Sequence, residues 1–171
     1  MSYLCPTNEE KEKLQKFYIA SRELLVSGMI PPICVQRSFE EAMSGFQNEY
    51  VWKPTHITPA AVKEIAEGRY KNVQRAHGVF GDRLGRFERT LCVLQSTVQD
   101  FDDWWRFYVQ HDATVLVTRT EHGLGKKFDK DELISVPEEP KDMFARGGFS
   151  FKLRKKIESA WIEKIYQERN L

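Results

Sequence analysis

The pattern of apolar and polar residues in the N-terminal part of the chain predicts a series of amphipathic helices. Thr7 followed by Glu10 is the pattern of a capping box, in which each side chain accepts a hydrogen bond from the backbone of the other residue. The apolar residues after it lie on one helical stripe up to Gly28, which predicts the helix end. Two shorter helices are expected to start after Ser38 and Thr58.

After the third helix, the helical periodicity gives way to patterns of turns and strands. The glycines in 70–86 predict loop or hairpin pieces. Phe87–Val98 is expected to be a buried strand because it centres on a short apolar run, and Ala113–Thr120 because apolar and β-branched residues dominate it. Further short strands are expected at Leu133–Val136 and Gly148–Leu153.

An aromatic helix is expected between the two longer strands. Asp100 with Asp103 is a capping pattern, and the aromatic residues after it have helical spacing. We expect Trp104, Trp105 and Tyr108 to be mostly buried against the sheet, because burying a large apolar side chain contributes about 1.5–3 kcal/mol. A final helix is expected to be lined by Ile157, Trp161 and Ile165.

These elements together predict the fold class. A chain of 171 residues is long enough for one hydrophobic core, and no repeat or linker divides it. We therefore expect a single α+β domain over residues 1–171. Its N-terminal helices are followed by a small, mostly antiparallel sheet with one crossing helix and a C-terminal helix.

Composition limits the functional classes. Hydrophobic residues make up 41% of the chain, which argues against disorder, and the net charge of +1 argues against a bulk nucleic-acid binder. No apolar run is long enough to span a bilayer, and the basic start and apolar run of a signal peptide are absent. An odd number of widely spaced cysteines favours reduced thiols. We expect a cytoplasmic protein with no membrane partner.

The strongest candidate for chemistry is the basic segment 69–89, which has six basic and two acidic side chains and thus a local charge of +4. His77 lies among these cations, and an imidazole can carry a proton at a hydroxyl or leaving group near neutral pH. Guanidinium groups bind phosphate oxygens and stabilise the charge that develops in phosphoryl transfer. The alternative is that these cations are ordinary solvated charges. We expect His77 and Arg89 to be catalytic, and Lys71, Arg75, Arg83 and Arg86 to bind the substrate.

Part of this segment resembles a motif of known ribonucleases. Asn72–Val79 is similar to the Asn-x-x-basic-His-Gly-Val stretch of some small toxin ribonucleases of the RelE/barnase-like superfamily, with one additional residue. The resemblance covers eight residues of 171. It does not place the chain in that superfamily.

A second candidate region lies at the end of the strand expected at Ala113–Thr120. Arg119–Gly123 is followed by Gly125, Lys126 and Lys127, and loops at strand ends often carry functional residues. His122 would be a second catalytic proton carrier if it pairs with His77 across the sheet, and Lys126 would add a substrate contact. The alternative interpretation is a solvent-exposed turn.

Several named chemistries have no matching motif. The sequence has no GxxxxGK[ST], no GxGxxG, no HExxH and no GxSxG. The best Asp/Glu-x-Lys match, Glu139-Pro140-Lys141, lies among prolines, where a ladder strand is disfavoured. We therefore expect no metal site and no cofactor.

These residues lead to two hypotheses of different classes. The first is a nuclease, a hydrolase of nucleic-acid phosphodiester bonds that uses histidine and arginine without a metal, with RNA-binding or DNA-binding left open. The second is a non-enzymatic binding or regulatory protein that uses the same basic surface for nucleic acid or a protein partner. A homo-oligomer is compatible with both. Convergence of His77 with several arginines in one site would favour the enzyme.

Overall fold

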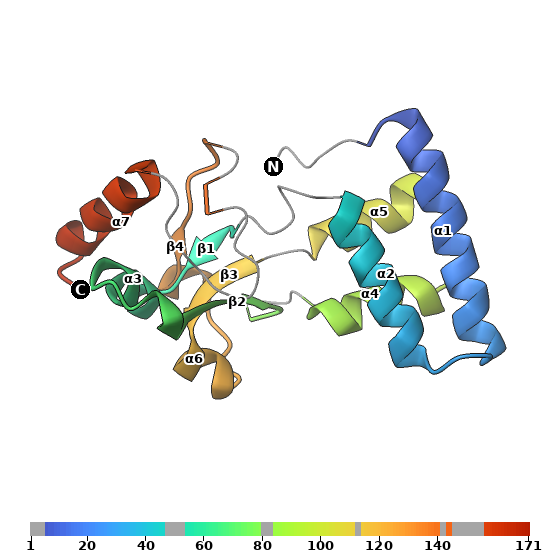
Figure 1. The fold of residues 1–171 in the computed structure, drawn as a ribbon, viewed down its shortest axis with the longest axis horizontal. Helices are drawn as coiled ribbons and strands as arrows, with labels where there is room; N and C mark the ends of the chain where they lie inside the picture. The colour runs from blue at the N-terminus through green and yellow to red at the C-terminus, as the bar shows by residue number, and fades with distance from the viewer. Residues whose placement is uncertain (1–5, 47–53, 80–83, 112–113, 141–142, 145–155) are drawn as a thin grey trace. The chain divides into compact units, whose positions relative to one another are not determined.

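The computed structural model describes residues 6–46, 54–79, 84–111, 114–140, 143–144 and 156–171 (Figure 1). They divide into two compact units, each made of two stretches of the chain. Residues 1–48 and 84–112 form the helical unit, and residues 49–83 and 113–171 form the sheet unit. The α+β fold class is confirmed. That the two units unfold as a single domain stays a prediction.

Among its described residues, the helical unit has four helices, and three of their starts follow the capping patterns or the prolines in the sequence. The Thr7–Glu10 capping box and the left-handed Gly28 bound the first helix, as expected. The second helix begins at Pro32 rather than after Ser38. Proline is favourable in the first helical turn because it has no backbone N–H to leave unpaired there, so Pro32 can start the helix. The four helices are α1 (Asn8–Ser27), α2 (Pro32–Phe46), α4 (Arg86–Gln95) and α5 (Phe101–Gln110).

The strand expected at Phe87–Val98 was wrong, because this stretch forms α4. Its buried residues follow the helical spacing, with Arg89 and Val93 one turn apart, whereas the side chain of Phe87 is 46% exposed. A short apolar run such as Leu91–Leu94 fits a buried strand and a helix equally well. Contact with the other helices therefore decides between them.

The aromatic residues of α5 are buried, but against helices instead of a sheet. Trp104 and Tyr108 have almost no exposed surface, and Trp105 is half-buried. The Trp104 ring stacks on Tyr18 of α1 with centroids 5.1 Å apart and packs edge-on against Phe39 of α2. The expectation of burial is thus confirmed for Trp104 and Tyr108. The expected partner surface was wrong because α4 and α5 join α1 and α2 in this unit.

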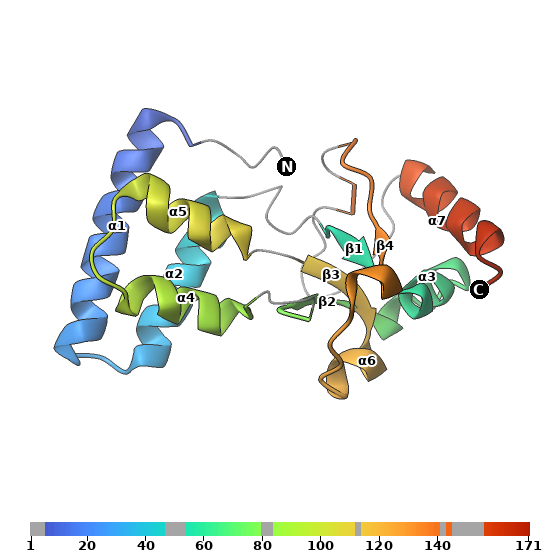
Figure 2. The same cartoon turned by 180° about the vertical axis from the view of Figure 1, so that it is seen from behind.

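In the part of the sheet unit that the structure describes, four strands form a sheet in the order β2-β3-β1-β4 (Figure 2). β3 (Thr114–Thr118) confirms the strand expected at Ala113–Thr120, and β4 (Ile134–Ser135) lies within the expected Leu133–Val136. β2 (Val73–His77) was expected to be loop or hairpin. It pairs antiparallel with β3, which pairs in parallel with β1 (His56–Ile57); β1 pairs antiparallel with β4. Gly148–Leu153 lies outside the described residues.

Helices cover one face of this sheet. On that face Val73, Leu116 and Ile57 pack with α3 (Pro59–Ala66) and α7 (Lys156–Glu168). α3 starts after Thr58, as expected. On the other face Ala76, Val115 and Val117 pack against Phe128 and Leu133. The connections contain the short helix α6 (Arg119–Gly123) and the 3-10 turns η1 (Tyr70–Asn72) and η2 (Lys130–Glu132).

The buried stripe of α7 differs from the one expected. Ile162 and Glu158 are buried, whereas Ile157 is 49% exposed, so the expectation for Ile157 was wrong. Trp161 and Ile165 are partly buried against the same core. Among the described helices, none combines the length and apolar character needed to cross a bilayer.

An ion-pair cluster at the end of α3 is expected to make stability depend on acid pH. Arg69 donates two hydrogen bonds of 2.8 Å to Glu64, and Asn72 adds one of 2.6 Å. These hydrogen bonds lower the pKa of Glu64 to about 2. Because the carboxylate is favoured in the folded state, its contribution is complete above the ordinary pKa of a glutamate and is lost as the pH falls toward 2.

Denaturant unfolding between pH 6 and pH 3, compared for the wild type and Glu64→Gln, measures this contribution. We expect the wild type to lose more stability on acidification than the variant, because glutamine does not titrate. Glu163→Gln, an exposed position on α7, is the control. Equal acid sensitivity of the wild type and Glu64→Gln would contradict the assignment.

Candidate functional site

The candidate site is built around His77, the last residue of β2. Antiparallel pairing places His77 opposite Thr114 of β3, and the Thr114 hydroxyl lies 3.3 Å from Nδ1 of the imidazole. Thr114 is buried and His77 is half-buried. A buried hydroxyl on one ring nitrogen fixes the orientation of the imidazole.

Arg75 lies on the same face of β2 as His77, because side chains two residues apart on a strand point to one side. Nη2 of Arg75 donates a 2.7 Å hydrogen bond to the carbonyl oxygen of Phe144. The backbone N–H of Phe144 in turn donates 2.7 Å to the carboxylate of Glu158, which is 1% exposed. Hydrogen bonding to the buried Phe144 thus fixes the position of the Arg75 guanidinium, although Arg75 remains half-exposed.

Phe144 has a positive φ of 55°, the left-handed conformation that non-glycine residues seldom adopt. This conformation costs about 1–2 kcal/mol, so the contacts around the residue must maintain it. Its ring is buried and packs edge-on against Trp161 of α7, with centroids 5.7 Å apart. The hydrogen bonds from Arg75 and to Glu158 hold its backbone on both sides.

Lys127 reaches the end of β2 from the connection after α6. Its Nζ donates to the carbonyl oxygen of Gly78, and the next residue, Phe128, donates from its backbone N–H to Val79 at 2.9 Å. Lys126 lies 4.5 Å from the centroid of the Phe128 ring and 3.5 Å from the carboxylate of Glu132. Lys127 therefore contacts the residue that follows His77 in the chain.

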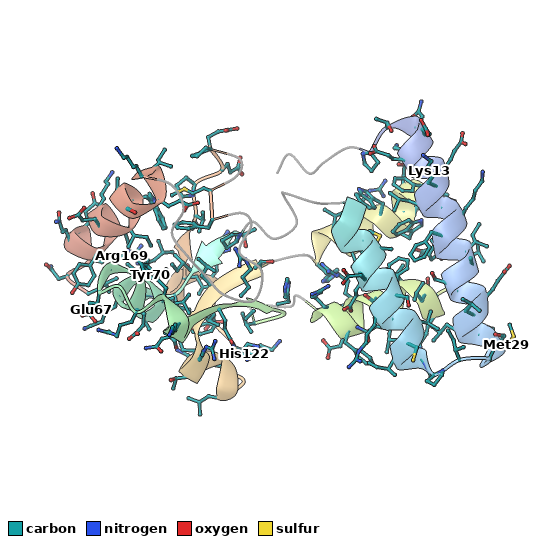
Figure 3. All side chains as sticks on the ribbon, viewed as in Figure 1. Lys13, Met29, Glu67, Tyr70, His122 and Arg169 are labelled. Atoms are coloured by element: carbon teal, nitrogen blue, oxygen red, sulfur yellow. The ribbon has the colours of Figure 1, made fainter. Side chains whose placement is uncertain are left out.

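His122 and Lys71 lie on the outside of the sheet unit. His122 is exposed on α6, a short helix where the sequence predicted a turn (Figure 3). Glu121 caps that helix at Thr118 and accepts a 2.9 Å hydrogen bond from the Thr58 hydroxyl, so Glu121 joins α6 to α3. Lys71 is exposed on η1.

The two arginines expected beyond residue 83 belong to the helical unit. Arg86 opens α4, and its Nη2 lies 3.7 Å from the carboxylate of Glu40. Arg89 is 2% exposed; its guanidinium lies 4.1 Å from the Tyr108 ring centroid and donates to the Tyr108 carbonyl oxygen at 3.4 Å. Such packing is typical of a structural arginine, and we leave Arg89 out of the site proposed below. Arg83 lies outside the described residues.

The structure places Arg75 and His77 of the predicted set on β2 and the other described candidates outside that strand. Arg75 and His77 share one face of β2 with Thr114 opposite His77, and Lys127 donates to Gly78, directly after His77. Thr114 was not among the candidates, and the Gly125-Lys126-Lys127 run was the sequence signal for Lys127. Within the described part of the chain, no three His, Cys, Asp or Glu side chains are grouped as ligands for a metal ion.

Comparison with known proteins assigns no family to this geometry. No protein-family model matches the chain, no curated protein matches its sequence, and no solved structure matches its fold.

Proposed function

We propose that the protein is a nuclease that cleaves nucleic-acid phosphodiester bonds without a metal. His77 carries the proton, and Arg75 and Lys127 bind the phosphate. The observation that supports this best is that the half-buried His77 shares one face of β2 with Arg75, while Lys127 donates to Gly78, the residue after His77. A proton carrier beside cations matches the needs of phosphoryl transfer, whereas metal sites of nucleases are built from carboxylates.

The chemistry of this set favours RNA as the substrate. The 2′-hydroxyl of RNA supplies a nucleophile within the substrate. Its oxygen bonds to phosphorus, the bond from phosphorus to the 5′-oxygen breaks, and the products are a 2′,3′-cyclic phosphate and a 5′-hydroxyl. His77 either removes the proton from the 2′-hydroxyl or gives one to the leaving 5′-oxygen. Arg75 and Lys127 stabilise the negative charge that develops on the phosphate oxygens.

The first test is cleavage in the presence of a chelator. We expect the purified full-length protein to cleave a fluorogenic single-stranded RNA equally well with EDTA and with magnesium, and to leave the matched DNA intact. Mass spectrometry of the products should identify the 2′,3′-cyclic phosphate. Loss of activity in EDTA would replace the proposed mechanism with a metal-dependent one. If the protein cleaves neither RNA nor DNA, the proposal that it is a nuclease is overturned.

A protein-binding role is the second candidate, and one observation in the helical unit favours it. Apolar side chains are exposed where α1 meets α2, with Val26 at 66% and Met29 at 74%. Leu24, Ile30 and Ile33 continue this patch. Adjacent exposed apolar side chains of this kind often mark a site of protein contact. Absence of both cleavage and binding of nucleic acid would favour this protein-binding role.

A further inference from the structure

Exposed cations continue from His77 along the whole length of β2. At the opposite end of the strand Val73 pairs with Thr118. Lys71 lies two residues before that pair and Arg119 directly after it, and both side chains are exposed. Neither forms an ion pair with another described residue. A second group of available positive charge therefore lies beyond the site at His77.

The segment from Arg119 to Lys127 joins the two ends of β2. It begins beside Thr118, the N-cap of α6, and α6 contacts both β2 and β3. After α6 the chain reaches the far end of β2, where Lys127 donates to Gly78 and Phe128 to Val79. His122, exposed and basic, lies midway along this segment. Figure 3 shows His122 on α6, near the end of the sheet where β2 begins.

The exposed cations from Lys71 and Arg119 at one end of β2 to Lys127 at the other form a row, and this row is longer than one phosphate group. Val73 and His77 are four residues apart, and an antiparallel strand rises about 3.4 Å per residue, so their separation is roughly 14 Å. A single phosphate bound between Arg75 and Lys127 would leave Lys71 and Arg119 without an anion. A chain of phosphates along β2 would contact both groups.

Because β2 lies at an edge of the sheet, one ligand can contact the whole row of cations from that edge. β2 is the edge strand of the described sheet order. Arg75 and His77 lie on the face of Val73, whereas the connection to Lys127 packs through Phe128 on the face of Ala76. At an edge strand, side chains from both faces can reach one ligand lying along the edge.

Carboxylates limit the row at both ends. Glu64 and Glu67 surround Arg69 before η1, and Asp129, Asp131 and Glu132 follow Lys127. These acidic groups repel phosphates placed beyond the row. The positive surface is therefore narrow and short, which suits one strand of a few nucleotides better than a duplex.

We propose that the row of Lys71, Arg119, His122 and Lys127, together with Arg75, binds the phosphate backbone of a single polynucleotide strand that runs along β2 and past His77. The bond cleaved at His77 belongs to that strand. The assignment of a substrate rests on the proposed nuclease function, but binding along the row does not require cleavage.

The test measures binding of a strand that the proposed chemistry cannot cleave. The wild-type protein is titrated into fluorescein-labelled 2′-O-methyl RNA of about two, four and eight nucleotides and into an eight-base-pair duplex, at several salt concentrations. Methylation blocks the 2′-oxygen that would attack phosphorus. We expect the affinity to rise from two to four or more nucleotides and the duplex to bind more weakly than the single strand.

A charge-removing variant locates the strand on the protein. Lys71→Gln/Arg119→Gln should weaken binding of the eight-nucleotide strand roughly tenfold and lower the slope of log K against log salt by about 1.4, or 0.7 per lost phosphate contact. Its affinity for the dinucleotide should stay at the wild-type value. Lys63→Gln/Arg169→Gln, with the same charge change on α3 and the chain end after α7, is the matched control and should bind as the wild type does.

The outcomes separate this proposal from the nuclease. If strand binding depends on Lys71 and Arg119 but unmodified RNA is not cleaved, the proposal of binding along the row is supported and the proposal of a nuclease is overturned. Cleavage of unmodified RNA with equal binding by both double variants keeps the enzyme and overturns the row. Preference for the duplex, or an affinity independent of length, also overturns the row.

Discussion

Replacing His77 with glutamine is expected to lower kcat/KM for RNA cleavage by about 10²–10⁴-fold, the usual loss when a general acid or base is removed. Glutamine keeps a polar group next to the Thr114 hydroxyl but cannot transfer a proton. The loss should fall on kcat, with KM little changed, because the proton moves in the transition state and not in substrate binding. Initial rates over a range of RNA concentrations provide both constants.

His56→Gln is the matched control for this prediction. His56 is also half-buried in the sheet unit, and its Nδ1 lies 2.9 Å from the Thr55 hydroxyl, but it belongs to β1. The control should retain activity, and both variants should unfold at similar denaturant concentrations. Equal activity of His77→Gln and the wild type would remove His77 from the mechanism. His122→Gln then tests the remaining proton carrier.

Replacing Trp104 with alanine is expected to lower the free energy of unfolding by about 3–5 kcal/mol, the range measured when a large buried aromatic is truncated. Trp104 has no exposed surface, stacks on Tyr18, and contacts Phe101 edge-on. Its indole N–H also donates a 2.7 Å hydrogen bond to Gln15. The variant leaves a cavity between α1, α2 and α5 and an acceptor on Gln15 that loses its donor.

Trp105→Ala is the control, because the neighbouring Trp105 is half-buried and should lose less stability. Urea unfolding followed by circular dichroism compares the two variants. Hydrogen exchange measured separately for amides of β3 and α1 also tests whether residues 1–171 behave as one domain. Loss of protection in both units on Trp104→Ala would confirm a single cooperative domain, whereas loss in the helical unit alone would make that expectation wrong.

Local signals in the sequence predicted the starts of several helices. Thr7, Thr58 and Asp100 each accept a hydrogen bond from a backbone N–H three residues later, as their capping patterns indicate. The β-branched run of β3 also predicted its strand. These features depend on residues that are close together in the sequence, so a single sequence is enough to identify them.

Long-range packing decided the elements that the sequence misassigned. Leu91–Leu94 lies in α4 because the helical stripe through Val93 and Leu94 packs on the helical core. β2 contains the polar residues Gln74, Arg75 and His77, and pairing with β3 rather than apolar alternation makes it a strand. Partners in both cases lie far away along the chain, where no local pattern specifies them.

The sequence by itself determined that 69–89 is rich in cations and contains a histidine, and that a second basic stretch follows at Arg119–Lys127. The tertiary structure decided which of these charges meet. β2 and β3 are paired neighbours, but the chain between them enters the helical unit, so Arg86 and Arg89 belong to a different unit from Arg75 and His77. The return of the chain to Gly78 and Val79 instead brings Lys127 to the residue after His77, because hydrogen bonds between distant segments, and not sequence order, fix which residues are neighbours.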